Sequence, residues 1–290
     1  MPEGPEVQQV LNSIEPKVLG KIISEVSVLH PKITMPFKKI GRQEVETFSQ
    51  RLEGGSIEKL ERKGKYLIFN LNQADTSTLY LVTHLGMTGA IFHVNDLDEI
   101  APNYRKHVHI IFKLNDKSLM VYSDQRRFGW MGALNKQEYT AYRPLQEVGP
   151  DPASEDTPRI FLEIIRNKAF INKPIKRVIM QPNVIQGVGN IYASECLYKA
   201  KLNPLTSVGE VSDEKLLELL GHIKETFELA IKLGGSSIRD YVNSEGKKGT
   251  FQELHMVYNK DFCPECGSSI ENLKIDQRSS FYCPNCQAKS

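Results

Sequence analysis

The sequence lacks any apolar run long enough to span a bilayer, because charged residues interrupt every long hydrophobic stretch of its 290 residues. It also lacks the basic segment and apolar core of a secretory signal, since it begins Met-Pro-Glu-Gly-Pro-Glu-Val. Internal repeats and low-complexity tracts are missing as well. We therefore expect ordinary globular domains with no membrane contact and a cytoplasmic location.

A large excess of one charge sign is also missing. Lys and Arg number 37 against 35 Asp and Glu, which gives a formal net charge of +2. Nucleic-acid binders are often strongly basic, but a protein of several domains can keep its basic residues on one face, so this balance excludes no class of partner. One stretch without acidic residues fits either a solvated surface or a nucleic-acid contact. It contains Arg166, Lys168, Lys173, Lys176 and Arg177.

The first part of the chain predicts one helix followed by several strands. Apolar residues recur at helical spacing over residues 7–14, and Gly20 is placed to end that helix. The strand-like runs that follow favour a β-sandwich or barrel over a parallel sheet with crossover helices. They cover residues 66–71, 78–83, 107–114 and 119–122.

A turn-rich stretch at residues 148–152 predicts a linker, after which the pattern becomes helical. The clearest helix is predicted from Ser212, as the N-cap, to a stop at Gly234 and Gly235. We therefore expect an α+β protein of three parts. They are a β-sandwich domain over residues 1–135, a helical domain over 150–249 and a cysteine module over 250–290.

Four of the five cysteines form two Cys-x-x-Cys pairs, Cys263 with Cys266 and Cys283 with Cys286. Two-residue spacing lets one tight turn direct two thiolates at a single ion, and two such turns complete a tetrahedral site. Disulfides and a redox pair are disfavoured, because an export signal is missing and a redox motif would not be duplicated. We expect one structural zinc ion there. The fifth cysteine, Cys196, is expected to be a buried small hydrophobe.

The second residue gains a distinct chemistry if Met1 is removed. Pro2 then carries a free secondary amine, whose ordinary pKa of about 7.7–8.0 leaves a neutral, nucleophilic fraction near neutral pH. A helix that begins just behind it would lower that pKa further through its N-terminal dipole. Such an amine can attack a sugar C1′ and form an iminium, which permits elimination of the flanking phosphates.

Five motifs occur in register along the chain. They are Pro2-Glu3, His84-Leu-Gly-Met-Thr-Gly89, Asp124-Gln-Arg-Arg-Phe-Gly129, Gly187-Val-Gly-Asn-Ile-Tyr-Ala193 and the four-cysteine module. Together they resemble the formamidopyrimidine-DNA glycosylase family, bacterial repair enzymes for oxidised purines, over residues 2 to about 287. The resemblance implies a β-sandwich N-terminal domain, a helix–two-turns–helix domain and a zinc finger. It also implies a monomer that binds damaged double-stranded DNA.

Matched position by position, the resemblance implies catalytic roles for three residues. Pro2 would be the Schiff-base nucleophile, and Glu3 the acid and base that protonates the deoxyribose ring oxygen. Lys65 matches the family's phosphate-binding lysine at the start of a strand. Lys63 lies close by, but the Lys-Tyr-Leu frame favours Lys65.

The resemblance also implies a phosphate grip formed by His84, Asn190 and Arg278. A helix is predicted to begin at Asn190, and the glycines before it permit the close backbone approach of an anion. The alternatives stay open for the other two residues. A lone histidine after an apolar strand is often a core or surface residue, and an arginine on a hairpin tip can serve solubility.

Taking a base out of the stack leaves a gap that side chains must fill. The family's three gap-filling residues map to Met87, Arg126 and Phe128. Methionine is a pliable apolar plug, phenylalanine a wedge between bases, and arginine a donor to the base left without a partner. Packing in a core is the alternative interpretation for Met87 and Phe128.

Three residues depart from the family pattern and bear on substrate preference rather than on the reaction class. Gly4 is more typical of the endonuclease VIII branch, which removes oxidised pyrimidines, whereas the intact gap-filling set favours the purine branch. Gln125 and Gln186 replace residues that are usually smaller or apolar. The segment 237–250 matches the family's flexible lid over the flipped base.

We therefore expect a bifunctional DNA glycosylase and abasic-site lyase. It would excise 8-oxoguanine and formamidopyrimidines through a Schiff base on Pro2, followed by β,δ-elimination. Two alternatives remain: an endonuclease VIII-like activity on oxidised pyrimidines, and a zinc-dependent module that binds damaged DNA without cutting it. The second alternative requires Pro2 to stay blocked by Met1, or Glu3 to be misplaced.

Overall fold

The computed structural model describes residues 2–33, 36–37, 41–42, 45–237 and 242–288. Contacts divide the chain into two compact units, Met1–Gln146 with Gly234–Gly249, and Glu147–Leu233 with Thr250–Ser290. The predicted linker at 148–152 falls at the first boundary. The segment 234–249 packs with the first unit, whereas the expected domain limits place it in the helical domain. The division into three domains with the expected limits stays a prediction, because the contacts separate only two units and do not test a boundary between the helical domain and the cysteine module.

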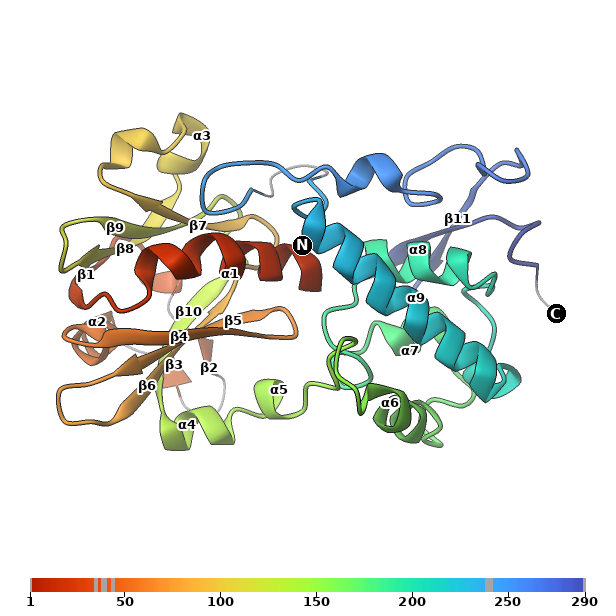
Figure 1. Ribbon diagram of the computed structural model, residues 1–290, viewed down its shortest axis with the longest axis horizontal. Coiled ribbons are helices and arrows are strands. Elements are labelled where there is room, and N and C mark those ends of the chain that lie inside the picture. The colour runs from red at the N-terminus through yellow and green to blue at the C-terminus, as the bar shows by residue number, and fades with distance from the viewer. Residues whose placement is uncertain (1, 34–35, 38–40, 43–44, 238–241, 289–290) are drawn as a thin grey trace. The chain divides into compact units, whose positions relative to one another are not determined.

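The first unit contains two antiparallel four-stranded sheets (Figure 1). One sheet has the order β1-β8-β9-β7, with β1 at Ile23–Val28, β8 at Val108–Leu114, β9 at Leu119–Asp124 and β7 at Gly89–Val94. The other has the order β10-β6-β5-β4, with β10 at Trp130–Asn135, β6 at Thr78–His84, β5 at Tyr66–Asn72 and β4 at Ser56–Lys63. All four predicted strand runs are confirmed.

The two sheets share one hydrophobic core with the first helix, α1 (Gly4–Val18). Val10 and Ile14 of α1 are fully buried, as is Phe69 of β5 and Phe112 of β8. The core therefore lies between the inner faces of the sheets, which makes the unit a β-sandwich. The predicted first helix is confirmed, and Gly20 follows it with a φ of 75°.

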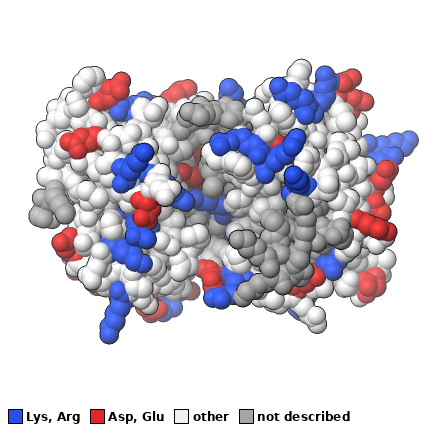
Figure 2. Space-filling view, turned by 180° about the vertical axis from the view of Figure 1, so that it is seen from behind, with Lys and Arg blue, Asp and Glu red and all other residues white. Residues whose placement is uncertain are grey.

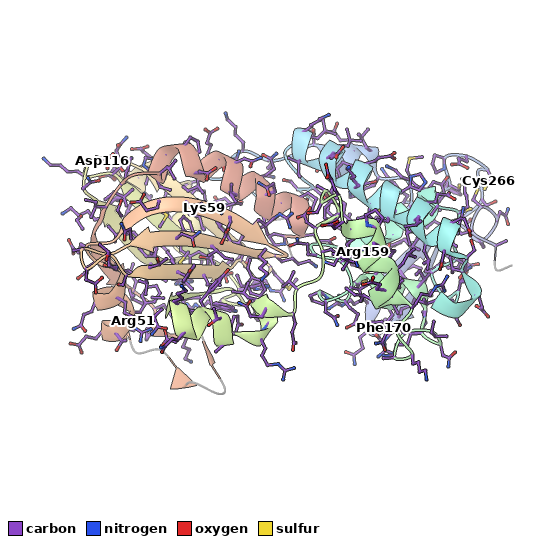
Figure 3. The ribbon with its side chains drawn as sticks, turned by 60° about the horizontal axis from the view of Figure 1, so that its bottom comes forward. Arg51, Lys59, Asp116, Arg159, Phe170 and Cys266 are labelled. Atoms are coloured by element: carbon purple, nitrogen blue, oxygen red, sulfur yellow. The ribbon has the colours of Figure 1, made fainter. Side chains whose placement is uncertain are left out.

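Short elements complete the first unit around the sandwich. Arg51, labelled in Figure 3, lies in α2 (Val45–Leu52). It donates hydrogen bonds to Glu138 of α4 (Lys136–Ala141) at 2.6 Å and to the Ala133 carbonyl of β10 at 3.0 Å, and so connects two helices to one sheet. The short elements are η1 (Pro31–Ile33), β2 (Pro36–Phe37), β3 (Gly41–Arg42), α2 (Val45–Leu52), η2 (Leu97–Glu99), α3 (Pro102–Arg105), α4 (Lys136–Ala141) and α5 (Arg143–Gln146).

The second unit is helical. Its longest helix, α9 (Asp213–Lys232), begins where predicted, because the Ser212 hydroxyl accepts a hydrogen bond from the Lys215 amide at 3.3 Å. Gly234 follows its end with a φ of 80°. The other elements are α6 (Thr157–Ile165), α7 (Ile175–Ile179), α8 (Asn190–Lys199), η3 (Val208–Glu210) and η4 (Phe251–Leu254). Cys196 is fully buried in the core that these helices share, as predicted.

The cysteine module adds a two-stranded hairpin, β11 (Glu271–Ile275) with β12 (Arg278–Tyr282). Asp276 and Gln277 join the strands with φ angles of 47° and 63°. Positive φ at both central residues is the geometry of a type I′ turn, whose twist matches that of the strands it connects. The turn places Arg278 at the exposed start of β12, next to the hairpin tip. Among the described residues, the longest helices are too short or too polar to cross a membrane.

Two glycines of the second unit give a test of its packing. An added methyl group at Gly221, inside α9, would meet nothing within 4 Å, so Gly221→Ala should raise the free energy of unfolding by about 0.5–1 kcal/mol. At Gly209 the same group would lie 2.9 Å from Ile171 Cγ2, so Gly209→Ala should lower it. Denaturant unfolding followed by circular dichroism measures both changes. A gain at Gly209 or a loss at Gly221 would contradict the packing.

Candidate nucleic-acid interface and zinc centre

Pro2 and Glu3 lie buried at the N-terminal end of α1. Glu3 is the N-cap of this helix and forms a capping box with Glu6, whose Oε2 accepts a hydrogen bond from the Glu3 amide at 2.8 Å. The other carboxylate oxygen of Glu6 accepts from the Ser236 amide at 2.7 Å. Glu6 therefore fixes the backbone of Glu3 and joins it to segment 234–249. Both candidate catalytic residues sit at the positive end of the helix dipole.

Lys65 lies in the two-residue turn between β4 and β5, after Gly64, which has a φ of 63°. Arg62 holds this turn, because its guanidinium donates to the Gly64 carbonyl and to Gln8 Oε1 of α1, each at 3.0 Å. The turn that carries Lys65 is thereby tied to the helix that begins at Pro2 and Glu3. Lys63 is the last residue of β4, on the other side of the turn.

His84 ends β6 and pairs across the sheet with Tyr66 and Trp130. Its ring stacks on Trp130 with ring centres 6.1 Å apart. Burial, and then the positive charge of Lys65, lower the pKa of His84 to about 4. Its Nδ1 lies 3.2 Å from the Gly86 amide and accepts that hydrogen bond, so the neutral ring carries its proton on Nε2. His84 is therefore a neutral hydrogen-bond donor near Lys65.

One buried carboxylate, Asp124, joins the two loops that carry the predicted gap-filling residues. Its Oδ1 accepts from the Thr88 hydroxyl and, at 3.1 Å, from the Arg126 amide, and its Oδ2 accepts from the Gly129 amide at 2.8 Å. The Thr88 hydroxyl itself accepts from the Arg126 amide at 2.9 Å. Loops 85–88 and 125–129 thus form one hydrogen-bonded block. Sequence reasoning missed Asp124, although it opens one of the five motifs.

Glycines bring the two loops into direct contact. An added methyl group at Gly129 would lie 2.6 Å from the His84 carbonyl oxygen, and one at Gly86 would lie 2.3 Å from the Gly129 nitrogen. Met87 and Phe128 point outward from this block, with 38% and 56% of their surface exposed. The Arg126 guanidinium stacks 4.7 Å above the Phe128 ring. The three predicted gap-filling residues therefore lie on adjacent loops, and core packing does not account for Met87 or Phe128.

The predicted lid segment 237–250 lies partly outside the described residues. Its described part packs on the first unit, where Val242 is buried against one sheet. The Ser244 amide donates to the Ser13 hydroxyl of α1 at 3.1 Å, and Glu245 forms an ion pair with Lys17 of the same helix at 3.0 Å.

In the second unit, helix α8 begins at Asn190, as predicted. Gly187 precedes it with a φ of 84°, which allows the tight entry into the helix. The Oδ1 atom of Asn190 is buried and has no hydrogen-bond partner among the residues that the structure describes. A buried polar atom without a partner is rare, and this one leaves an acceptor available to a ligand or water at the start of α8.

Arg278 is exposed and has no ion-pair partner within the described part of the chain. It lines a cavity of about 210 Å³ between the hairpin and α7. Arg177 lines the same cavity and forms an ion pair with Asp276 at 2.6 Å, which holds the hairpin tip against α7. Lys176 completes this basic lining.

Lys176 and Arg166 show that the basic stretch 166–177 is not simply a solvated surface. Lys176 is 1% exposed, and its ammonium donates to the Ser194 hydroxyl of α8 at 2.9 Å and to the Ser279 carbonyl of β12 at 3.3 Å. Arg166 binds Asp213 Oδ1 at 2.7 Å. These two residues stabilise the unit, and sequence reasoning missed that role because a run of basic residues does not show which of them pack inward. Lys and Arg groups on the face in Figure 2 lie among Asp and Glu side chains.

A second residue that sequence reasoning missed is Glu195 of α8. Its buried carboxylate accepts hydrogen bonds from the backbone amides of Met256, Val257 and Tyr258 at 2.7, 3.1 and 2.7 Å. Burial raises the pKa of Glu195, and these three bonds oppose the rise. Glu195 therefore fastens the segment that leads into the cysteine module.

The four cysteines of the module converge as predicted. Their sulfur atoms, from Cys263, Cys266, Cys283 and Cys286, all lie within 4.8 Å of one another. Two of the separations are 3.4 Å, from Cys266 to Cys283, and 3.8 Å, from Cys263 to Cys286. Zinc–sulfur bonds of about 2.3 Å in a tetrahedron separate the sulfurs by about 3.8 Å. The cluster fits one structural zinc ion, with all four coordination positions taken by the protein.

The state of His84 gives a pH-dependent prediction. Its folded pKa of about 4 lies below the ordinary value of 6.5, so between these pH values the unfolded chain binds a proton that the folded chain does not. Stability of the first unit should therefore fall as pH drops from about 6.5 to 4, with His84 contributing about 2–3 kcal/mol of that loss. His84→Gln should reduce the loss measured by denaturant unfolding at pH 7 and pH 4.5. Equal losses in both proteins would count against a buried neutral His84.

Three family sequence models match the chain in succession. The Formamidopyrimidine-DNA glycosylase N-terminal domain matches residues 1–131, and the Formamidopyrimidine-DNA glycosylase H2TH domain matches residues 148–242. The zinc finger found in FPG and IleRS matches residues 260–289.

Individual relatives match over the whole chain. Formamidopyrimidine-DNA glycosylase of Bacillus subtilis is 34% identical, with 100% of each chain covered. A complex of wild-type Lactococcus lactis Fpg with N7-benzyl-Fapy-dG-containing DNA has a TM-score of 0.84 at 31% identity, and covers 99% of this chain and 100% of the other. The same protein with DNA that contains an oxidised pyrimidine has a TM-score of 0.84 at 30% identity and the same coverage. The chain therefore belongs to the formamidopyrimidine-DNA glycosylase family, the DNA-binding, zinc-finger glycosylases of base excision repair.

Proposed function

We propose that the protein excises oxidised purines, 8-oxoguanine and formamidopyrimidines, from double-stranded DNA and then cleaves the abasic site by β,δ-elimination. The observation that carries this proposal is the fixed placement of Pro2 and Glu3 at the N-terminus of α1. The Lactococcus lactis relative in complex with modified Fapy-dG DNA supports the same substrate class. We further propose that the protein acts as a cytoplasmic monomer.

Pro2 is the nucleophile in this proposal. Once Met1 is removed, the Pro2 nitrogen becomes a secondary amine at the positive end of α1, where the helix dipole favours its neutral form. It attacks C1′ of the damaged nucleotide and displaces the base, which leaves an iminium between Pro2 and the opened sugar. Loss of the C2′ proton from that iminium then expels the 3′ phosphate, and a second elimination expels the 5′ phosphate.

Glu3 moves the protons in the proposed reaction. As a carboxylic acid it donates to the ring oxygen O4′ while C1′ is attacked, and as a carboxylate it takes a proton back during elimination. Its backbone is fixed by the hydrogen bond to Glu6. Because Glu3 is adjacent to Pro2 and buried with it, both can reach one sugar that is excluded from water.

Lys65 and His84 form the proposed phosphate grip of the first unit. Lys65 supplies a charge, and His84 supplies a neutral Nε2–H donor at the end of the neighbouring strand. In the second unit the proposed contacts are Asn190, at the start of α8, and Arg278, at the start of β12. These four residues combine one helix N-terminus with charged and neutral donors, which is how proteins usually position DNA backbones.

Met87, Arg126 and Phe128 would fill the space that the flipped nucleotide leaves. The hydrogen-bonded block around Asp124 holds their loops together before DNA arrives, so less ordering is needed on binding. The stacked Arg126 and Phe128 side chains present an apolar face and a polar edge side by side. A wedge must replace base stacking, and a donor must satisfy the base left unpaired.

Excision of oxidised pyrimidines is the second candidate. Gly4 stands in the first turn of α1, directly after Glu3, and Gln125 is exposed beside Arg126. Both residues depart from the purine-branch pattern at positions next to proposed catalytic or DNA-contacting residues. The Lactococcus lactis relative in complex with oxidised-pyrimidine DNA shows that a similar protein accommodates such DNA.

Borohydride trapping tests the mechanism and separates the candidates. The protein is incubated with duplexes that contain either 8-oxoguanine opposite cytosine or an oxidised pyrimidine, and reduction converts the iminium into a stable amine. We expect an adduct on the Pro2 peptide, stronger with the purine lesion, and a much weaker one for Glu3→Gln.

The other possible outcomes of the trapping experiment distinguish the remaining hypotheses. An adduct mainly on the pyrimidine duplex keeps the mechanism and selects the second candidate. Intact mass verifies loss of Met1, and a processed protein that binds both duplexes without any adduct would establish a binding module instead. Undiminished trapping by Glu3→Gln would remove Glu3 from the mechanism.

The phosphate role of Lys65 has its own test, with Lys63 as the matched control on the other side of the same turn. Lys65→Ala should weaken binding to every DNA sequence and reduce the slope of log affinity against log salt by about 1. Lys63→Ala should leave that slope unchanged. Fluorescence anisotropy at several salt concentrations measures both, and a slope change confined to Lys63→Ala would transfer the role to Lys63.

A further inference from the structure

Tyr198, in the last turn of α8, contacts the zinc centre from outside the cysteine module. Its side chain is 1% exposed and packs against Val257, Cys263 and Cys283. Its hydroxyl oxygen lies 3.2 Å from the sulfur of Cys263. Hydrophobic packing requires only the aromatic ring. It does not explain why the hydroxyl lies against the sulfur of a predicted metal ligand.

The direction of this hydrogen bond follows from the chemistry of zinc binding. A cysteine that ligates zinc is a thiolate and can only accept, so the Tyr198 hydroxyl must donate to Cys263. One Zn²⁺ and four thiolates leave a site with a formal net charge of −2. Such a site is stabilised by donors that point at its sulfurs, and these outer hydrogen bonds influence how strongly the metal is held.

Two of the other sulfurs, those of Cys283 and Cys266, have donors of a different origin. The Cys286 amide donates to the Cys283 sulfur at 3.4 Å, and the Ser268 hydroxyl lies 3.4 Å from the Cys266 sulfur. These donors belong to the module itself. Cys266 is labelled in Figure 3, at the outer edge of the second unit. Tyr198 differs because it contacts the first Cys-x-x-Cys turn, Cys263 to Cys266 (the first knuckle), from helix α8. Asn190 is the first residue of that helix.

Lys201, three residues after Tyr198, makes a second connection between the end of α8 and the first Cys-x-x-Cys turn. Its ammonium lies 4.7 Å above the Tyr198 ring and forms an ion pair with Glu265, between the two cysteines of the first knuckle. Glu265 Oε2 is 3.9 Å from the Cys286 sulfur. A carboxylate beside a thiolate is repelled, so the positive charge of Lys201 is what permits Glu265 to stay there.

We propose that Tyr198 is a positioning residue of the zinc centre: its hydroxyl donates to the Cys263 thiolate, holds α8 against the first knuckle and slows the loss of zinc. Lys201 assists by neutralising Glu265. The zinc finger is thereby fastened through a ligand of the metal as well as through its hydrophobic contacts. Metal retention becomes a property of the helical unit and not of the finger alone.

Zinc transfer to a coloured chelator, 4-(2-pyridylazo)resorcinol, tests this proposal on the full-length zinc-loaded protein. Tyr198→Phe keeps the ring and removes only the hydroxyl, and it should release zinc about tenfold faster than the wild type. Tyr282→Phe is the matched control, because the Tyr282 hydroxyl belongs to the same module but donates to Glu271. It should release zinc within about twofold of the wild-type rate.

Replacing zinc by cobalt gives a second measurement, the absorption band of the thiolate–cobalt bond. This band would not move if Tyr198 only packed against the module. Removing a donor from a thiolate raises the energy of its lone pairs, so the thiolate-to-cobalt absorption band should move to longer wavelength in Tyr198→Phe and stay in place in Tyr282→Phe. Wild-type release rates and an unmoved band in Tyr198→Phe would overturn the proposal. Equal acceleration by both variants would overturn it too.

A surface variant keeps the test available if Tyr198→Phe does not fold. Lys201 is partly exposed, so Lys201→Met leaves the core intact and should release zinc faster by leaving Glu265 unpaired beside Cys286. Adding Glu265→Gln should return the rate to the wild-type value. Unchanged release in Lys201→Met, or no recovery in the double variant, would contradict the assisting role of Lys201.

Discussion

A single buried carboxylate, that of Asp124, joins the two loops of the first unit that carry the proposed gap-filling residues. A fully buried carboxyl group is costly unless its oxygens are hydrogen-bonded, and here the donors come from both loops at once. The Thr88 hydroxyl and the amides of Arg126 and Gly129 reach it only when loops 85–88 and 125–129 lie side by side. Separating the loops would leave the Asp124 oxygens without these donors, so the hydrogen bonds favour the arrangement in which Met87 and Phe128 are exposed.

The second unit uses the same physical solution around helix α8. Lys176 connects α8 to strand β12, and Glu195 connects it to the segment that enters the zinc finger. Both side chains are buried, and the hydrogen bonds described for them are made with hydroxyl and backbone groups. Asn190 and Arg278, the proposed phosphate contacts, begin the two elements that Lys176 joins. The zinc ion then stabilises the finger end of this assembly.

The proposed DNA contacts do not require a large net charge on the chain, which is only +2. His84 is a neutral donor, the start of α8 offers backbone amides, and several basic residues are committed to internal bonds. Residue types and motif order therefore predicted which positions would contact DNA, but not the protonation state or burial of those residues. The neutral form of His84 follows from burial beside Trp130 of β10 and from the nearby charge of Lys65, in the turn between β4 and β5.

The sequence by itself determined those features whose causes are local. Ser212 and Gly234 set the limits of α9 because capping acts within one helical turn, and two Cys-x-x-Cys turns specified a four-thiolate zinc site because each knuckle needs only its own residues. Only the tertiary structure decided that Lys176 is buried while Phe128 is exposed, against the usual preference of both residue types. Burial is a property of what packs around a residue, and the groups that enclose Lys176 come from α8 and β12, far away in the chain.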